Sequence, residues 1–150
     1  SDGSLLWHYH AGPITNTLIL LQGNIVYAAS ADAHVYALHS DTGKLLWQQT
    51  VPHSPTDFYD FSYGGRIAAD HDIVAVNYTR LWDPLTNSER GMIYVFRAQN
   101  GANLWHHEML SQETGLLGVD NKAVYITDVL KPGQGQLITS ARRAADGKEL

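Results

Sequence analysis

The sequence predicts an all-β protein built from repeated four-stranded antiparallel units. A short pattern recurs along the chain, in which a turn containing glycine leads into an apolar run that ends in tryptophan. Such recurrence is typical of repeat architectures. The segments between the copies are short and rich in β-branched and aromatic residues, which favours strands over helices. The copies are Asp2–Trp7, Asp41–Trp47, Asn100–Trp105 and Asp146–Leu150, the last of which stops one residue before a tryptophan would fall.

The spacing of the copies predicts propeller blades. Their glycines lie 40, 58 and 46 residues apart, and each tryptophan follows its glycine by four residues. The shortest spacing matches a four-stranded blade of about 40–45 residues, and the longer two require insertions. Glycine gives the backbone freedom for a tight turn, and an indole is large enough to fill the gap to the next sheet. We therefore predict structural, blade-docking roles for Trp7, Gly43, Trp47, Gly101, Trp105 and Gly147.

The first complete unit, residues 11–52, contains four predicted strands separated by polar turns. Gly23 and Asn24 favour a turn after the first strand, and Asp41–Gly43 forms the turn before the fourth. The predicted strands are Ile14–Leu20, Ile25–Ser30, His34–His39 and Lys44–Thr50.

The remaining units vary this plan within a single domain, residues 1–150. The unit 53–108 carries an insertion, Arg80–Arg90, which connects its second and third strands. The unit 109–150 is an incomplete blade, because its fourth strand is cut off at Leu150. Residues 1–10 are expected to form the outer strand of a preceding blade. The other predicted strands are Ser62–Ala68, Ile73–Tyr78, Met92–Arg97, Ala102–His107, Gly115–Val119, Ala123–Thr127 and Gln136–Ala141.

The stretch Ala37–Trp47 resembles the tryptophan-docking motif of PQQ-like (quinoprotein-type) β-propellers. That motif begins with Ala and ends in Trp, with Thr-Gly between them. Ala141 stands in the same phase to Gly147, whereas Val95 takes that place in the second unit. The acidic residue often found two positions after the Ala is absent here. The resemblance implies about three blades, each like a WD40 blade in having four antiparallel strands, in a partial or oligomer-completed propeller.

The same resemblance leaves the function open. The family spans alcohol and sugar dehydrogenases, outer-membrane assembly scaffolds and sensor domains attached to kinases. Quinoprotein dehydrogenases place a quinone cofactor and a calcium ion on the axis of a closed eight-bladed ring, which three blades alone do not enclose. Extracytoplasmic placement, periplasmic or at the cell surface, is what the resemblance implies.

Composition narrows the possible partners and chemistry. A net charge of −5 disfavours nucleic acid as a partner, because phosphate neutralisation needs a basic patch. No apolar run approaches the roughly 20 residues of a membrane-spanning helix. The chain has no cysteine, which excludes a disulfide framework and a cysteine nucleophile. The eight histidines offer pairs only, whereas a zinc site needs three or four converging ligands.

One aromatic cluster stands out from the repeat. The segment 58–63 precedes the second unit, and the insertion with Trp82 should emerge at the same end of the blade. Insertions gathered on one face of a repeat array often form its binding face, although such aromatics can also pack as local core. The candidate residues for binding a protein or small-molecule ligand are Phe58, Tyr59, Phe61, Tyr63 and Trp82.

These observations favour a non-catalytic scaffold, or a ligand-sensing or protein-interaction module, with no catalytic residue, metal or cofactor assigned. The alternative is a fragment of a PQQ-dependent dehydrogenase, for which PQQ and calcium would be the cofactors. Three blades are too few to close a ring, since propellers have about 4–8. We therefore expect that Ser4–His10 completes the third blade of another copy, giving a homodimer by strand exchange.

Overall fold

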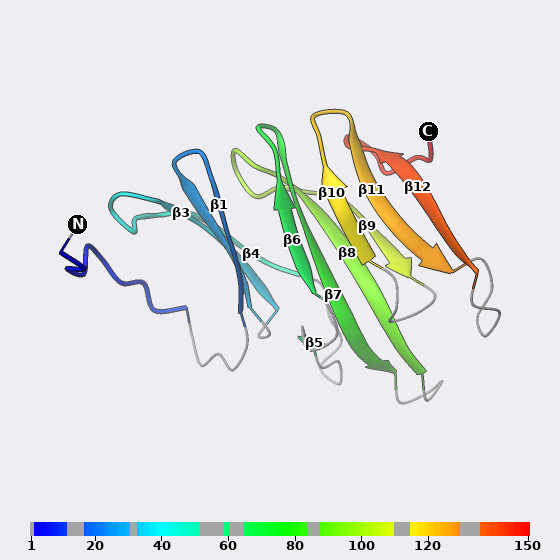
Figure 1. Cartoon of the computed structure of the whole chain (residues 1–150), viewed down its shortest axis with the longest axis horizontal. Coiled ribbons are helices and arrows are strands. Elements are labelled where there is room, and N and C mark those ends of the chain that lie inside the picture. The colour runs from blue at the N-terminus through cyan, green and yellow to red at the C-terminus, as the bar shows by residue number, and fades with distance from the viewer. Residues whose placement is uncertain are drawn as a thin grey trace.

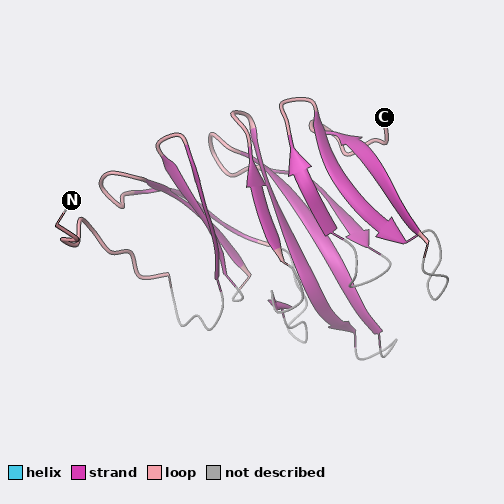
Figure 2. Cartoon of the chain, in the orientation of Figure 1, coloured by secondary structure: helices cyan, strands magenta, loops and turns pink. Residues whose placement is uncertain are grey.

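The computed structural model consists of three antiparallel sheets that stand side by side, as Figure 1 shows. It describes residues 2–11, 17–30, 33–51, 59–60, 65–83, 88–109, 115–129 and 136–150. All regular elements within these residues are strands (Figure 2), which confirms the predicted all-β class. In the part of the chain described here, no helix is long and apolar enough to cross a membrane.

The first sheet has its four strands in sequence order, joined by tight connections. Gly23 has a φ of +59° in the turn between the first two strands, a conformation that suits glycine. The register pairs Tyr27 with Ala37 and Ala37 with Trp47, so these side chains share one face. The strands are β1 (Thr17–Gln22), β2 (Ile25–Ser30), β3 (His34–His39) and β4 (Leu45–Thr50).

The second sheet is larger than the predicted four-stranded blade. The insertion Arg80–Arg90 is not a separate loop, because its two flanking strands continue as one hairpin that pairs as far as Asp83 and Ser88. A bulge between Tyr78 and Leu81 allows the pairing to continue. The segments are β5 (Tyr59–Asp60), β6 (Arg66–Ala69), β7 (Ile73–Asp83), β8 (Ser88–Arg97) and β9 (Asn103–Met109).

The third sheet has three strands in order, β10 (Gly115–Val119), β11 (Ala123–Val129) and β12 (Leu137–Arg143). A fourth strand begins against β12, where Glu149 forms a bridge with Arg142. There the Leu150 N–H donates to the carbonyl of Ala141 at 2.9 Å. The strands β1, β6 and β10 lie along the same side of the stacked sheets, which we call the inner side, and β6 contacts both β1 and β10.

The core fills the two gaps between the sheets, and the middle sheet is buried on both faces. Alternate residues of β7 serve the two gaps, with Val76 facing the first sheet and Ala75 the third. The first gap is filled mainly by Tyr27, Val35, Trp47, Val74, Tyr78, Tyr94 and Phe96. The second gap is filled mainly by Ile73, Ile93, Val95, Met109, Leu116, Val124 and Ile126.

Each tryptophan of the repeat lies against a glycine turn of the next sheet. A Cβ added to Gly101 would lie 2.6 Å from Cε3 of Trp47, so only glycine fits beneath the ring. The indole Nε1–H of Trp47 donates to the carbonyl of Ala98 at 2.7 Å. Trp7 lies in the same way on Gly43 and donates to Ser40, and Trp105 lies on Gly147 and donates to Ala144.

A partly buried polar cluster also joins the second and third sheets. His107 Nε2 on β9 lies 3.5 Å from Asp128 Oδ2 on β11, and their side chains are only 22% and 13% exposed. Burial lowers the pKa of His107, and the positive charge of Arg142 lowers it further. Asp128 and Glu108 act in the opposite direction without reversing the shift.

We predict that Gly101→Ala destabilises the protein more than Gly23→Ala does. Both residues have positive φ, so each alanine costs about 1–2 kcal/mol in backbone strain. Only Gly101 lies beneath an indole, and overpacking there adds about 1–3 kcal/mol. Urea denaturation of the two variants measures the difference. Equal losses would contradict a packing role for the glycine turn.

We predict that stability falls as the pH drops from about 7.5 to about 5.5, and that His107→Gln reduces this dependence. Because the pKa of His107 is lowered in the folded protein, the unfolded chain binds the proton first as the pH falls below about 6.5. Urea unfolding at several pH values tests this. The control is His106→Gln, at an exposed neighbour on β9, which should retain the wild-type slope. An unchanged slope in His107→Gln would contradict the prediction.

Candidate functional site

The candidate site is the lower end of the second sheet in Figure 1, formed by β5 and the far end of the β7–β8 hairpin, which we call the lower projection. β7 and β8 extend beyond the other strands on this side. β5 pairs with that extension, with Tyr59 opposite Leu81 and Asp60 opposite Arg80. Two segments about 20 residues apart in sequence are thereby brought together by backbone pairing alone.

The bulge in β7 separates the lower projection from the stacked core. Tyr78, the last residue before the bulge, is fully buried, and so is Met109 at the end of β9. The opposing strand carries Gly91, where an added Cβ would collide with the Met109 side chain. Bulges often re-aim strands beside functional sites. Here the described core reaches Tyr78, and the paired hairpin continues beyond the bulge to Asp83 and Ser88.

The structure places two of the five predicted binding residues within this projection. Tyr59 lies in β5, opposite Leu81, and Trp82 is the next residue along β7 and pairs with Glu89. Only the backbones of Tyr59 and Trp82 are described. Phe58, Phe61 and Tyr63 lie outside the described residues. Sequence reasoning placed Trp82 in a connecting loop and did not anticipate the strand that joins it to Tyr59.

The opposite, upper end is built from structural turns. The carboxylate of Asp120 accepts the N–H groups of Lys122 and Ala123, both at 2.8 Å, and these bonds lower its pKa. Asp70 accepts the His71 N–H at 2.7 Å, and its pKa is lowered by its bonds to His71. These carboxylates serve their own turns, as Asp commonly does. The carboxylates of Asp70 and Asp120 at the upper end are therefore already used in hydrogen bonds within their own turns.

The described residues contain no group of three or more His, Cys, Asp or Glu side chains that could hold a metal ion. The adjacent His106 and His107 point to opposite faces of β9, as successive strand residues do. The His106 and Tyr94 ring centroids are 5.8 Å apart, whereas His107 reaches Asp128 of the third sheet.

Comparison with known proteins supports the fold. The family described as outer membrane protein assembly factor BamB matches residues 1–116. BamB from Moraxella catarrhalis superposes with a TM-score of 0.61 at 19% identity, covering 99% of this chain and 39% of that protein. A europium-containing methanol dehydrogenase superposes with a TM-score of 0.56 at 14% identity, covering 87% of this chain and 30% of that one.

A sequence relative links the chain to the same repeat. Quinoprotein alcohol dehydrogenase PedH from Pseudomonas putida is 28% identical in an alignment 134 residues long that covers 81% of this chain. The chain spans only 21% of the length of that relative. The repeated glycine–tryptophan contacts, the stacked antiparallel sheets and the family match over 116 residues agree with one another. The chain therefore belongs to the BamB-like family of PQQ-repeat β-propeller proteins.

Proposed function

We propose that this chain is a non-catalytic scaffold that binds a protein partner through the lower projection. The observation that carries the proposal is the pairing of β5 with the extended β7–β8 hairpin. This pairing extends the sheet beyond the bulge. A feature that the stacking of blades does not require, and that carries aromatic residues, is a candidate for recognition.

The chemistry of the lower projection suits a protein surface. Tryptophan and tyrosine are enriched among residues that dominate binding energy at protein interfaces. Tyr59 and Trp82 lie on paired strands one register position apart. The charged residues Asp60, Arg80 and Glu89 are their neighbours in the pairing, so the projection combines aromatic and charged residues, as interfaces do.

The matched family suggests the class of partner. Its description names an outer membrane protein assembly factor. We infer that the partner of this chain is a component of such an assembly apparatus and that the chain acts in an extracytoplasmic compartment. The lower projection would then bind the partner, and the stacked blades would serve as the scaffold that carries this binding surface.

A second candidate is a part of a quinone-dependent dehydrogenase, favoured by the 28% identity to quinoprotein alcohol dehydrogenase PedH. In that case PQQ and calcium would bind on the propeller axis. The two candidates differ in a simple readout. Only the dehydrogenase alternative requires that PQQ with calcium change the tryptophan fluorescence and the melting temperature of this chain.

We predict that Trp82→Ala weakens partner binding about tenfold or more while leaving stability nearly unchanged, since aromatic anchors commonly contribute 2 kcal/mol or more. A photo-crosslinking residue at position 82, introduced in the cell, should capture an envelope protein that mass spectrometry identifies. Binding of that protein to purified wild type and Trp82→Ala then gives the ratio of affinities.

Two controls sharpen this test. The same crosslinker at Asn121, an exposed turn at the upper end, should capture nothing comparable. Trp47→Ala should unfold the protein far more readily, because a buried tryptophan contributes about 3–5 kcal/mol. If Trp82→Ala costs as much stability as Trp47→Ala, the residue belongs to the core and the site is wrong.

The two flanks of the stack are also proposed to be contact surfaces, in this case for a second copy. Gly3 has the φ of the other motif glycines, +76°, but nothing lies within 4 Å of its added Cβ. Leu5 and Leu6 are 78% and 82% exposed, and their segment, predicted as an outer strand, forms no strand within this single chain. At the opposite flank, β12 pairs along its length with β11, and its other edge carries only the start of a fourth strand among the described residues, where Glu149 bridges Arg142 and Leu150 bonds to Ala141.

We predict that strand exchange gives a dimer in which Ser4–His10 of one copy pairs with β12 of the other. Light scattering at micromolar concentration should give twice the mass of one chain. Leu6→Glu should shift the mass toward the monomer, because it places a charge on the strand that would be covered. A strictly monomeric mass for the wild-type protein excludes the exchange.

A further inference from the structure

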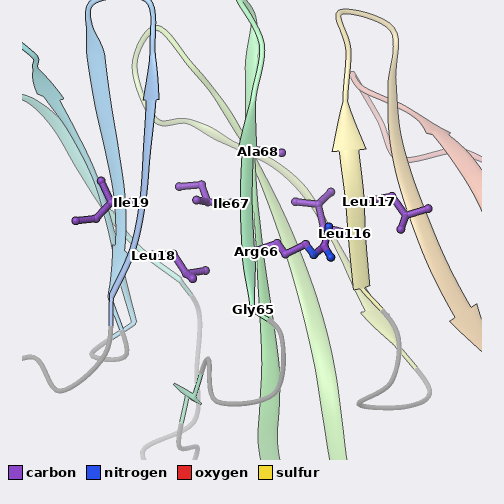
Figure 3. A pocket seen from close by; sticks show the side chains of 8 residues that line it. All are labelled: Leu18, Ile19, Gly65, Arg66, Ile67, Ala68, Leu116 and Leu117. Carbon is purple, nitrogen blue, oxygen red and sulfur yellow. The ribbon is translucent and has the colours of Figure 1, made fainter.

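A pocket lies beside β6, between this strand and the neighbouring strands β1 and β10 of the other two sheets. Figure 3 shows its lining, with Leu18 from β1, Arg66 and Ile67 from β6 and Leu117 from β10. Its volume is about 360 Å³, within the range of sites that hold small molecules. Apart from Arg66, the side chains that line it are aliphatic.

The pocket lies against the free edge of β6. Arg66 and Ile67 are consecutive strand residues, so their side chains point to opposite faces of the sheet, yet both line the pocket. Figure 3 shows the two side chains extending from the two sides of β6, so the pocket spans the edge of β6 that is not paired with β7. Among the described strands β6 pairs with β7 alone, so its other edge presents backbone groups that no neighbouring strand uses.

Arg66 is the cationic group of the pocket. Its side chain extends toward Leu116 in Figure 3 and makes no hydrogen bond or ion pair with the residues that the structure describes. A guanidinium remains charged at any physiological pH and offers five donors in a planar fork. Arg66 is exposed, so its guanidinium is accessible to a ligand that has both a carboxylate and an apolar body.

Asn77 holds the β10 wall of the pocket in place. It is fully buried and is the cross-strand partner of Arg66 in the pairing of β6 with β7. Its Oδ1 accepts the N–H of Leu116 at 3.1 Å, which fixes the start of β10 against the second sheet. A Cβ added to Gly115 would lie 3.1 Å from the same oxygen, so the approach is close. Asn77 is therefore a positioning residue for the pocket wall.

We propose that this pocket binds an aliphatic carboxylate, with its carboxylate on Arg66 and its hydrocarbon chain against Leu18 and Ile67. Figure 3 shows Leu18 and Ile67 in the space between β1 and β6, where both are only partly buried, so a bound chain would cover them. The site uses residues other than those of the lower projection and does not depend on the proposed scaffold function.

Isothermal titration of the full chain with octanoate tests the proposal. Octanoate should bind the wild type, and Arg66→Gln should weaken binding about tenfold or more, as expected for a hydrogen-bonded charge. Octan-1-ol, which has the same chain without the charge, should bind both proteins equally. Acetate, which has the charge without the chain, should bind at least about tenfold more weakly than octanoate.

The control variant is Arg97→Gln, an exposed arginine at the outer end of β8, which should leave octanoate binding unchanged. Melting temperatures of all variants verify that they are folded. Equal binding of octanoate to wild type and Arg66→Gln would overturn the proposal. Acetate that binds as tightly as octanoate would also overturn it, because the site would then recognise only an anion.

Discussion

The contact of an indole with a glycine turn is the interaction on which the stacking of this chain depends. It occurs three times in the same form, with the ring on the glycine and the Nε1–H bonded to a carbonyl of the same turn. The contacts of Trp47 and Trp105 join the outer strand of one sheet to a turn of the next, and Trp7 reaches the first sheet from a segment that forms no strand. Because the glycine has positive φ and no room for a Cβ, the turn and the ring specify each other. The spacing of blades is therefore set by a few residues.

This arrangement determines where the chain can vary. The middle sheet is buried on both faces, so the stretches 73–76 of β7 and 92–96 of β8 are apolar throughout. Asn77 follows the first of these stretches as a fully buried polar residue, and its Oδ1 accepts the N–H of Leu116 in the third sheet. Differences between blades are accommodated at the strand ends and at the inner edges, where the lower projection and the Arg66 pocket lie. Both proposed sites lie where stacking imposes the fewest constraints.

Much of the fold could be predicted from the sequence because its signals are local. The turn before β4, the alternation within β3 and the phase of Trp47 to Gly43 depend on residues close in the chain. The lower projection could not be predicted in the same way. Whether Leu81 continues a strand depends on a partner, and Tyr59 lies some 20 residues away. Gly91 is a signal that was available, since a glycine within a strand often marks a bulge or a close contact.

The Arg66 pocket shows a second reason why sites escape sequence analysis. Arg66 begins a short strand, and in sequence it looks like an ordinary exposed residue before an apolar run. Its significance arises from three inner strands that meet beside it, each from a different blade. The repeat explains why they meet, because every blade brings its first strand to the same side. A ligand there would lie between the first strands of neighbouring blades, at a place that no single repeat contains.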